Sequence, residues 1–341
     1  RTVTPPGPEA RTMHTTIRGI ALLILAVAAY FAPVLAGGSG AVYSALVLIA
    51  IFAAMSYGLD LIVSDLGEVS LAHTVFFAVG CYTTALLSTR AGAGGWATLG
   101  ASIGAALLFA AVLGLVTLRL REFVFSLVTY AIAVVASTVA QNWSFLGGSD
   151  GLRGIPVLDL SLPGLTLKAG NDRELWPIAF GLLVVVLYLV DRFRNSRLGS
   201  AAVMTHLNTR LAIVSGIDPQ QVRLKVFLFS APITASAGWL YAYQRAYVSA
   251  DVLDSYFLIL MLTAVVLVGR RLLLGPLLAT VLVLGQEKFL SLGGYADKII
   301  LGSVLIATLA LFPKGLIGFV EPLRAMLRGR GADTVRRSGA A

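Results

Sequence analysis

Four residues that could bind a polar solute or move a proton stand close together at the head of one apolar segment: Glu68, Ser70, His73 and Thr74. The residues after them are apolar over a length that can enter a lipid bilayer. Ionisable groups at membrane depth are costly, so they usually face the interior of a helix bundle or a water-filled path. We therefore predict that these four side chains line a pathway for a polar solute.

The same side chains also have other interpretations that the sequence leaves open. His73 could be a hydrogen-bonded group of the bundle interior, and Glu68 could pair with a residue of a partner subunit. Ser70 and Thr74, one helical turn apart, could bond to backbone carbonyls. In a further interpretation, Glu68 and His73 act as the acid and base of an intramembrane enzyme.

The composition indicates an integral membrane protein. Of the 341 residues, 57% are hydrophobic and 13% are charged, whereas a soluble domain has about 25% charged residues. The net charge of +9 does not indicate nucleic-acid binding, because the basic residues lie between apolar segments rather than on one soluble face. With one cysteine, Cys81, an intramolecular disulfide is excluded, and the three histidines are too far apart along the chain for a metal-binding motif.

Apolar segments near the length that a helix needs to cross the hydrocarbon core, about 20 residues, recur along the chain. They lie at residues 19–36, 41–63, 69–89, 96–118, 123–141, 176–190, 226–248, 257–269, 272–289 and 299–313. We therefore predict an all-α integral membrane protein with about ten transmembrane or re-entrant helices. This domain, 19–313, is flanked by a disordered arm at 1–18 and a tail at 314–341.

The basic residues predict the orientation of the chain. Most of the 26 Lys and Arg residues fall in segments that share one side if the N-terminus is cytoplasmic. Cytoplasmic loops carry the excess of Lys and Arg, so both termini are predicted to be cytoplasmic. The long segment 191–225 then lies inside, and the turn-rich segment 142–175 forms an outer loop that could be a surface cap or a docking surface for an external partner.

The inner segment predicts an amphipathic helix outside the membrane. Its apolar residues are spaced by three and four positions: Ala201, Met204, Leu207, Leu211 and Val214. Asn195 or Ser196 can cap a helix over 195–215, and Gly216 suits its C-terminal cap. Asp218 and Pro219 then predict the start of the helix that becomes the seventh span. Lipid could cover the amphipathic helix, but its few Lys and Arg residues favour a protein partner.

Several motifs of self-powered or catalytic proteins are absent from the sequence. None of the five lysines follows a glycine, so there is no phosphate-binding Gly-Lys-Ser/Thr loop. There is also no Gly-x-Ser-x-Gly and no His-Glu-x-x-His motif. An autonomous ion-coupled carrier needs ionisable groups within several spans, whereas those outside the first cluster, such as Asp60, Glu287 and Lys288, lie near span ends. An energy source on another chain is therefore favoured.

The cluster that begins at Gly67 also carries a family resemblance. The stretches Gly67-Glu68-Val69-Ser70-Leu71-Ala72-His73, Phe76-Phe77 and Gly80-Cys81-Tyr82-Thr83 resemble the Gly-Gln-Val-Ser-Leu-Gly-His … Phe-Phe … Gly-Ala-Tyr-Thr signature of LivM-type permease subunits of branched-chain amino acid ABC importers. Further stretches agree in order: Asn142-Trp143, Gly147 to Leu152, Gly154-Ile155-Pro156, Ser196-Arg197-Leu198-Gly199, Gly216-Ile217 and Leu311 to Leu316. The resemblance covers roughly residues 40–320.

The resemblance implies a non-catalytic subunit of a larger importer in a bacterial-type inner membrane. Its expected partners are a second permease subunit, two ABC ATPase subunits that hold ATP and Mg, and an extracytoplasmic substrate-binding protein; this chain itself would hold no cofactor. The segment 197–216 would be the coupling helix that sits in a groove of the ATPase. The residues expected to make this contact are Arg197, Met204, His206, Leu207, Asn208, Arg210, Leu211 and Gly216.

The sequence departs from the family pattern at three places. Gly269-Arg270-Arg271 stands in a stretch that is usually Gly-rich, and the middle of the coupling segment lacks acidic residues. Glu68 replaces the usual Gln, and a carboxylate near the pathway would favour a cationic or amide group. Branched-chain amino acids are the family default, and related systems handle urea, short amides and small aromatic acids.

Overall fold

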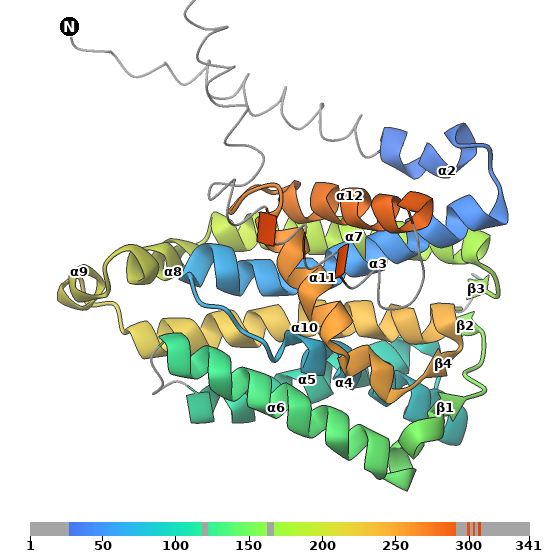
Figure 1. Ribbon diagram of the computed structural model, residues 1–341, viewed down its shortest axis with the longest axis horizontal. Helices are drawn as coiled ribbons and strands as arrows, with labels where there is room; N and C mark the ends of the chain where they lie inside the picture. The colour runs from blue at the N-terminus through green and yellow to red at the C-terminus, as the bar shows by residue number, and fades with distance from the viewer. Residues whose placement is uncertain are drawn as a thin grey trace, which may run out of the picture.

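The computed structural model describes residues 27–117, 122–161 and 167–290, together with 299, 300, 303, 306 and 307. Long helices run side by side along one axis, with the short helix α9 at one end of the bundle and the strands at the other (Figure 1). The predicted arm at 1–18, the tail at 314–341, the first part of segment 19–36 and most of segment 299–313 lie outside the described residues.

The described part of the chain is mainly helical. Its longer helices are α3 (Gly40–Asp60), α4 (His73–Arg90), α5 (Gly95–Thr117), α6 (Glu122–Asn142), α7 (Asp172–Arg194), α10 (Pro219–Arg245), α11 (Ser255–Val266) and α12 (Gly275–Leu290). The shorter elements are α2 (Ala32–Leu35), the π-helix η1 (Leu61–Leu66), the 3₁₀ helices η2 (Ser144–Leu146), η3 (Gly148–Asp150) and η4 (Ala250–Leu253), and the helices α8 (Arg197–Leu207) and α9 (Thr209–Val214).

Among the described residues, 4 helical segments are long and apolar enough to cross a membrane: Gly40–Leu66, Gly95–Leu115, Phe123–Asn142 and Asp172–Arg194. Helices α11 and α12 are apolar but shorter. Helix α10 would reach about 40 Å at 1.5 Å per residue, but its first turns carry the polar and charged residues Gln220, Gln221, Arg223 and Lys225. The described residues therefore form helices that suit a membrane protein, as predicted. The further membrane crossings of the predicted ten stay a prediction.

The fourth helix begins later than the apolar pattern predicts. Residues 67–72 are not helical, and α4 starts at His73, so the prediction that Ser70 and Thr74 share a helix face is wrong. Gly67 has φ 72°, which ends η1 in the left-handed region. The backbone after it bonds to α6 instead: Leu71 N donates to Thr129 Oγ1 at 3.1 Å, and Ser126 Oγ donates to Val69 O at 2.7 Å.

Helix α10 is the centre of the bundle and packs against α3, α4 and α5 (Figure 1). The contact with α4 is a close approach of two backbones. A Cβ added at Gly80 would overlap the carbonyl oxygen of Ala235, and one added at Gly238 would overlap that of Phe77. Small residues let membrane helices approach in this way, because no large side chain separates the backbones.

The segment predicted as one helix over 195–215 is two helices, because the chain breaks at Asn208. This residue has φ −157° and ψ 94°, and its side chain caps α9 by accepting from Leu211 N at 3.0 Å. Asn is a strong N-cap residue, so it competes with helix continuation. The other local predictions are confirmed: Ser196 caps α8, and Asp218 caps α10 with Pro219 in its first turn.

Short antiparallel strand pairs hold the segment after α6 against the bundle. Strand β1 (Leu152–Arg153) pairs with β4 (Tyr247–Val248), which follows α10, and β2 (Leu158–Asp159) pairs with β3 (Lys168–Ala169). Trp96 Nε1 of α5 donates to Leu160 O at 3.1 Å. Hydrogen bonds from Ser161, with Lys168 beside it, hold the pKa of Asp159 below its usual range.

We expect Gly80→Ala to lower the stability of the bundle, because the added methyl group must separate α4 from α10. Overpacking of this kind costs ~1–3 kcal/mol, which thermal unfolding in detergent would report as a lower midpoint. Gly104→Ala in α5 is the matched control, because an added Cβ meets no atom within 4 Å there. The control should be neutral or stabilising by up to ~1 kcal/mol. Equal midpoints for the two variants would contradict the close-packing argument.

Candidate functional site

The structure gives Glu68 a charged partner within the same chain. Its side chain is buried, and Arg223 Nε of α10 lies 2.6 Å from Glu68 Oε1. Arg223 belongs to the second turn of a helix that begins directly after the segment 197–216. The ion pair therefore joins the residues before α4 to the first turns of α10, and no residue of another subunit is needed to balance Glu68.

His73 is hydrogen-bonded inside the contact between α4 and α10. Its Nδ1 lies 3.0 Å from Ser70 Oγ, and its Nε2 lies 3.2 Å from Ser230 Oγ. Ser230 Oγ donates to Phe227 O at 2.9 Å, so it can accept a hydrogen bond from His73 Nε2, and Ser70 Oγ can donate to Nδ1. Phe76 and Phe227 pack edge-on against the ring. These partners of His73 differ from Arg223, the charged partner of Glu68.

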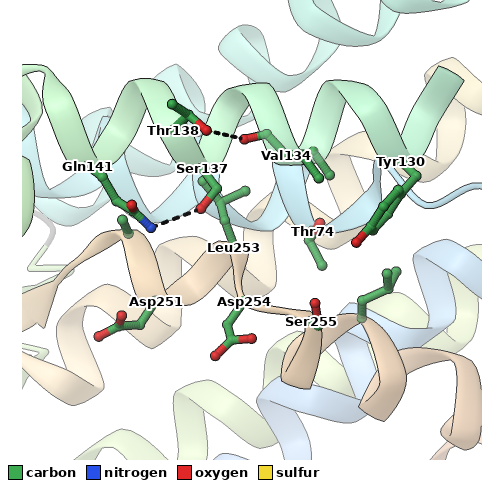
Figure 2. A pocket seen from close by; sticks show the side chains of 13 residues that line it. Thr74, Tyr130, Val134, Ser137, Thr138, Gln141, Asp251, Leu253, Asp254 and Ser255 are labelled. Carbon is green, nitrogen blue, oxygen red and sulfur yellow. Dashed lines mark hydrogen bonds between the residues drawn. The ribbon is translucent and has the colours of Figure 1, made fainter.

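Thr74, one of the four predicted pathway residues, lines a cavity. This cavity has a volume of about 250 Å³ and lies between α4, α6, η4 and α11 (Figure 2). Glu68, Ser70 and His73 are instead packed against α6 and α10 within this chain. Their role in a pathway stays a prediction.

A buried ion-pair network, which the sequence did not reveal, lies where α3 continues into η1. Arg194 Nη2 is 2.6 Å from Asp60 Oδ2, and Arg194 Nε is 3.2 Å from Asp65 Oδ2. Arg271 Nε approaches Asp65 Oδ1 at 3.1 Å, and Ser64 Oγ donates to Asp60 Oδ1 at 2.5 Å. Both carboxylates are buried, so they depend on these cations.

This network connects three segments that are distant in sequence. Arg194 ends α7 directly before α8, and Arg271 lies between α11 and α12. Arg271 has φ 60°, a left-handed conformation that side chains rarely adopt, so it occupies a position where glycine is favoured. In the sequence, the one indication of this network is that Asp60 and Asp65 stand at the end of an apolar segment. The sequence does not show that Arg194 and Arg271 pair with them.

The predicted docking residues lie at the end of the bundle away from the strands (Figure 1). Met204, Leu207 and Leu211 expose their apolar side chains, as does Val214. Polar or small members of the set are also exposed: Arg197, Asn208, Arg210 and Gly216. His206 packs against Gly67, where an added Cβ would overlap its ring. Within the described ranges, no group of three His, Cys, Asp or Glu side chains could hold a metal ion.

These features define a membrane protein with several apolar spans, a polar cavity and an exposed apolar surface at one end. The chain belongs to the family described as branched-chain amino acid transport system / permease component, whose profile matches residues 41–309. It is therefore a permease component of a transport system rather than an enzyme.

Two curated relatives are similar along nearly the whole chain. Both are named high-affinity branched-chain amino acid transport system permease protein LivM. The one from Escherichia coli (strain K12) is 25% identical and the one from Salmonella typhimurium (strain LT2) is 26% identical. Each comparison covers 95% of this chain and 80% of the relative. No solved structure matches the chain.

Arg194→Gln should destabilise the protein strongly, because it leaves two buried carboxylates without their shared cation. Removing one partner of a buried ion pair costs ~3–5 kcal/mol, seen as a lower unfolding midpoint in detergent. Arg192→Gln, on the exposed side of the same last turn of α7, is the control and should change stability by no more than ~0.5 kcal/mol. A midpoint for Arg194→Gln equal to that of the control would contradict the importance of the network.

Proposed function

We propose that this chain is the membrane-spanning permease subunit of an ATP-driven ABC importer. It passes a small polar solute, such as a branched-chain amino acid, from a substrate-binding protein into the cytoplasm. It works with a second permease subunit and with two ABC ATPase subunits that hold ATP and Mg. The proposal that separate ATPase subunits drive transport is supported mainly by the exposed apolar surface of α8 and α9. This surface lies at the end of the bundle predicted to be cytoplasmic.

This surface is suited to a protein groove. Leu207 is 76% exposed, Leu211 56% and Val214 85%, although they lie beyond the apolar spans. Burying an exposed leucine or valine side chain gains ~1.5–3 kcal/mol, so a partner that covers the three would be held firmly. Between residues 195 and 216 the basic residues are Arg197 and Arg210, fewer than a helix that binds anionic lipid usually carries.

The docking helices are in contact with the elements that would have to move. His206 of α8 packs against Gly67, and Glu68 next to it pairs with Arg223 of α10. Arg194, three residues before α8 begins, pairs with Asp60 and Asp65. Displacement of α8 is therefore passed to η1 and to the segment 67–72. π-helical turns often mark functional sites, and η1 supports a two-state rearrangement driven by nucleotide on the partner.

Leu207→Asp and Leu211→Asp are expected to abolish co-purification of the ATPase subunits, because each places a carboxylate in an apolar groove. Arg210→Glu should have the same effect through its reversed charge. Val157→Asp is the control, since Val157 is comparably exposed at the opposite end. All four variants should keep the unfolding midpoint of the parent protein. Retained assembly in the α8–α9 variants would overturn the docking assignment.

Uptake into proteoliposomes tests the energy source directly. We expect the complex of two permeases, two ATPases and binding protein to accumulate L-leucine only with ATP. This chain alone should give no uptake with either ATP or an ion gradient. Uptake by this chain alone under an ion gradient, indifferent to ATP, would instead identify an autonomous secondary carrier.

A further inference from the structure

We propose that two adjoining cavities at the strand end of the bundle form one binding site for a phospholipid whose headgroup carries a phosphate and an ammonium. The larger cavity, of about 810 Å³, is lined by residues of α2, α3, α10, α11 and α12. The smaller, of about 350 Å³, lies between the end of α10, β4, η4 and α11. Tyr241, Arg245 and Phe257 line both, so one amphiphilic molecule can occupy the two together.

The larger cavity has the properties of a site for hydrocarbon chains. Its lining is apolar except for Tyr241, Tyr256 and Arg245. One face of α3 forms its wall from Ala41 to Phe52, and this stretch rises about 16 Å at 1.5 Å per residue. Half of a hydrocarbon core of ~30 Å is about 15 Å, so the wall has the depth of one leaflet. An amino-acid side chain would leave most of this volume empty.

The walls of the larger cavity are open to the outside of the bundle. Helices α2, α3 and α12 lie along one side of it (Figure 1). Ala41 and Val281, which line the cavity, are exposed, as are Leu278 and Leu282 beside it on α12. Exposed apolar side chains on the helices of a membrane protein are in contact with lipid tails, which are as apolar as leucine. Acyl chains can therefore enter the cavity from the membrane.

The smaller cavity carries two opposite charges that suit a zwitterionic headgroup. Arg245 and Asp251 both line it and are exposed, and no ion pair of the described residues joins them. Asp251 accepts from Ser249 Oγ at 2.9 Å, and the Arg245 guanidinium lies 5.6 Å from the centre of the Tyr241 ring. A guanidinium binds phosphate through paired N–H donors, and a carboxylate accepts from an ammonium. The cavity thus offers a partner to each charge of the headgroup.

The aromatic residues around Arg245 are typical of the membrane surface. Tyr241, Tyr247 and Tyr256 line one or both cavities, and tyrosine is enriched where its amphipathic ring can sit at headgroup level. Arg245 is the last residue of α10, and an arginine there can lay its stem on apolar surface while its charge reaches the interface. One orientation of the lipid therefore places its headgroup in the smaller cavity and its acyl chains in the larger.

Native mass spectrometry of the full chain, purified in detergent, freed of lipid and titrated with phosphatidylethanolamine, tests the phosphate contact. Arg245→Gln should weaken binding by about tenfold, because the phosphate loses a charged donor. Arg90→Gln is the matched control and should stay within about twofold of the parent. Arg90 also ends a helix and lies over an aromatic ring, that of Phe145, but it lines neither cavity. Equal affinities of the two variants would overturn the phosphate contact.

The ammonium contact is tested by comparing phosphatidylethanolamine with phosphatidylglycerol, which has a phosphate but no ammonium, at equal acyl-chain length. The parent protein should bind phosphatidylethanolamine more tightly, and Asp251→Asn should bring the two affinities within about twofold of each other. Asp150→Asn removes another exposed side chain of the same charge outside both cavities and should keep the parental preference. Equal binding of the two lipids by the parent protein would overturn the zwitterionic headgroup.

The larger cavity is tested by filling it. Ala45→Phe should weaken phosphatidylethanolamine binding by about tenfold, the effect of displacing about two buried methylene groups. Ala131→Phe, at an exposed position of α6 outside both cavities, should bind as the parent does. Thermal unfolding without lipid should show that both variants are folded. Parental binding by Ala45→Phe would overturn the acyl-chain site.

Competition separates this site from a site for a transported solute. Glycerophosphoethanolamine, which has the headgroup without acyl chains, and L-leucine should both fail to displace phosphatidylethanolamine at millimolar concentration. Displacement by L-leucine would identify the smaller cavity as an amino-acid site and overturn the proposal, as would a parent protein that binds no phosphatidylethanolamine. The binding assay needs neither ATPase nor binding protein, so a failure of ATP-dependent uptake would contradict the proposed function and leave the lipid site standing.

Discussion

The close approach of α10 to α3 and α4 is the contact on which most of the structure depends. Gly58 faces Thr234, and Gly80 and Gly238 bring the backbones of α4 and α10 together. Lipid provides no hydrophobic driving force between helices, so dense packing and interhelical hydrogen bonds have to stabilise the contact. At this separation His73 reaches Ser230, and Cys81 Sγ donates to Gly238 O at 3.2 Å.

The same packing determines how the charges near α8 are held. Asp60 and Asp65 are buried because α3 continues as η1 inside the bundle. Their negative charges are balanced by Arg194 and Arg271. Breaking such a buried pair is expensive. The end of α7, which leads into α8, is consequently tied to the membrane helices. A partner that binds α8 and α9 would act on a connected structure rather than on a loose loop.

The sequence predicted well wherever a feature depends on neighbouring residues. Ser196, Asp218 and Pro219 mark helix starts, because capping is a contact between residues a few positions apart. The prediction of one helix over 195–215 was wrong because the side chain of Asn208 caps a new helix, which the apolar spacing does not reveal. The start of α4 was misplaced for a different reason: the backbone of 67–72 bonds to Ser126 and Thr129 of α6, which no local pattern reveals.

By itself the sequence determined that this is a mainly helical membrane protein of the permease family, because composition, apolar length and motif order are properties of the chain alone. Only the tertiary structure decided what the polar residues do. It paired Glu68 with Arg223, enclosed His73 between two hydroxyls, and placed Thr74 in a cavity that residues of α6, η4 and α11 also line. These groups come from segments far apart along the chain, so their chemistry exists only after the helices have packed.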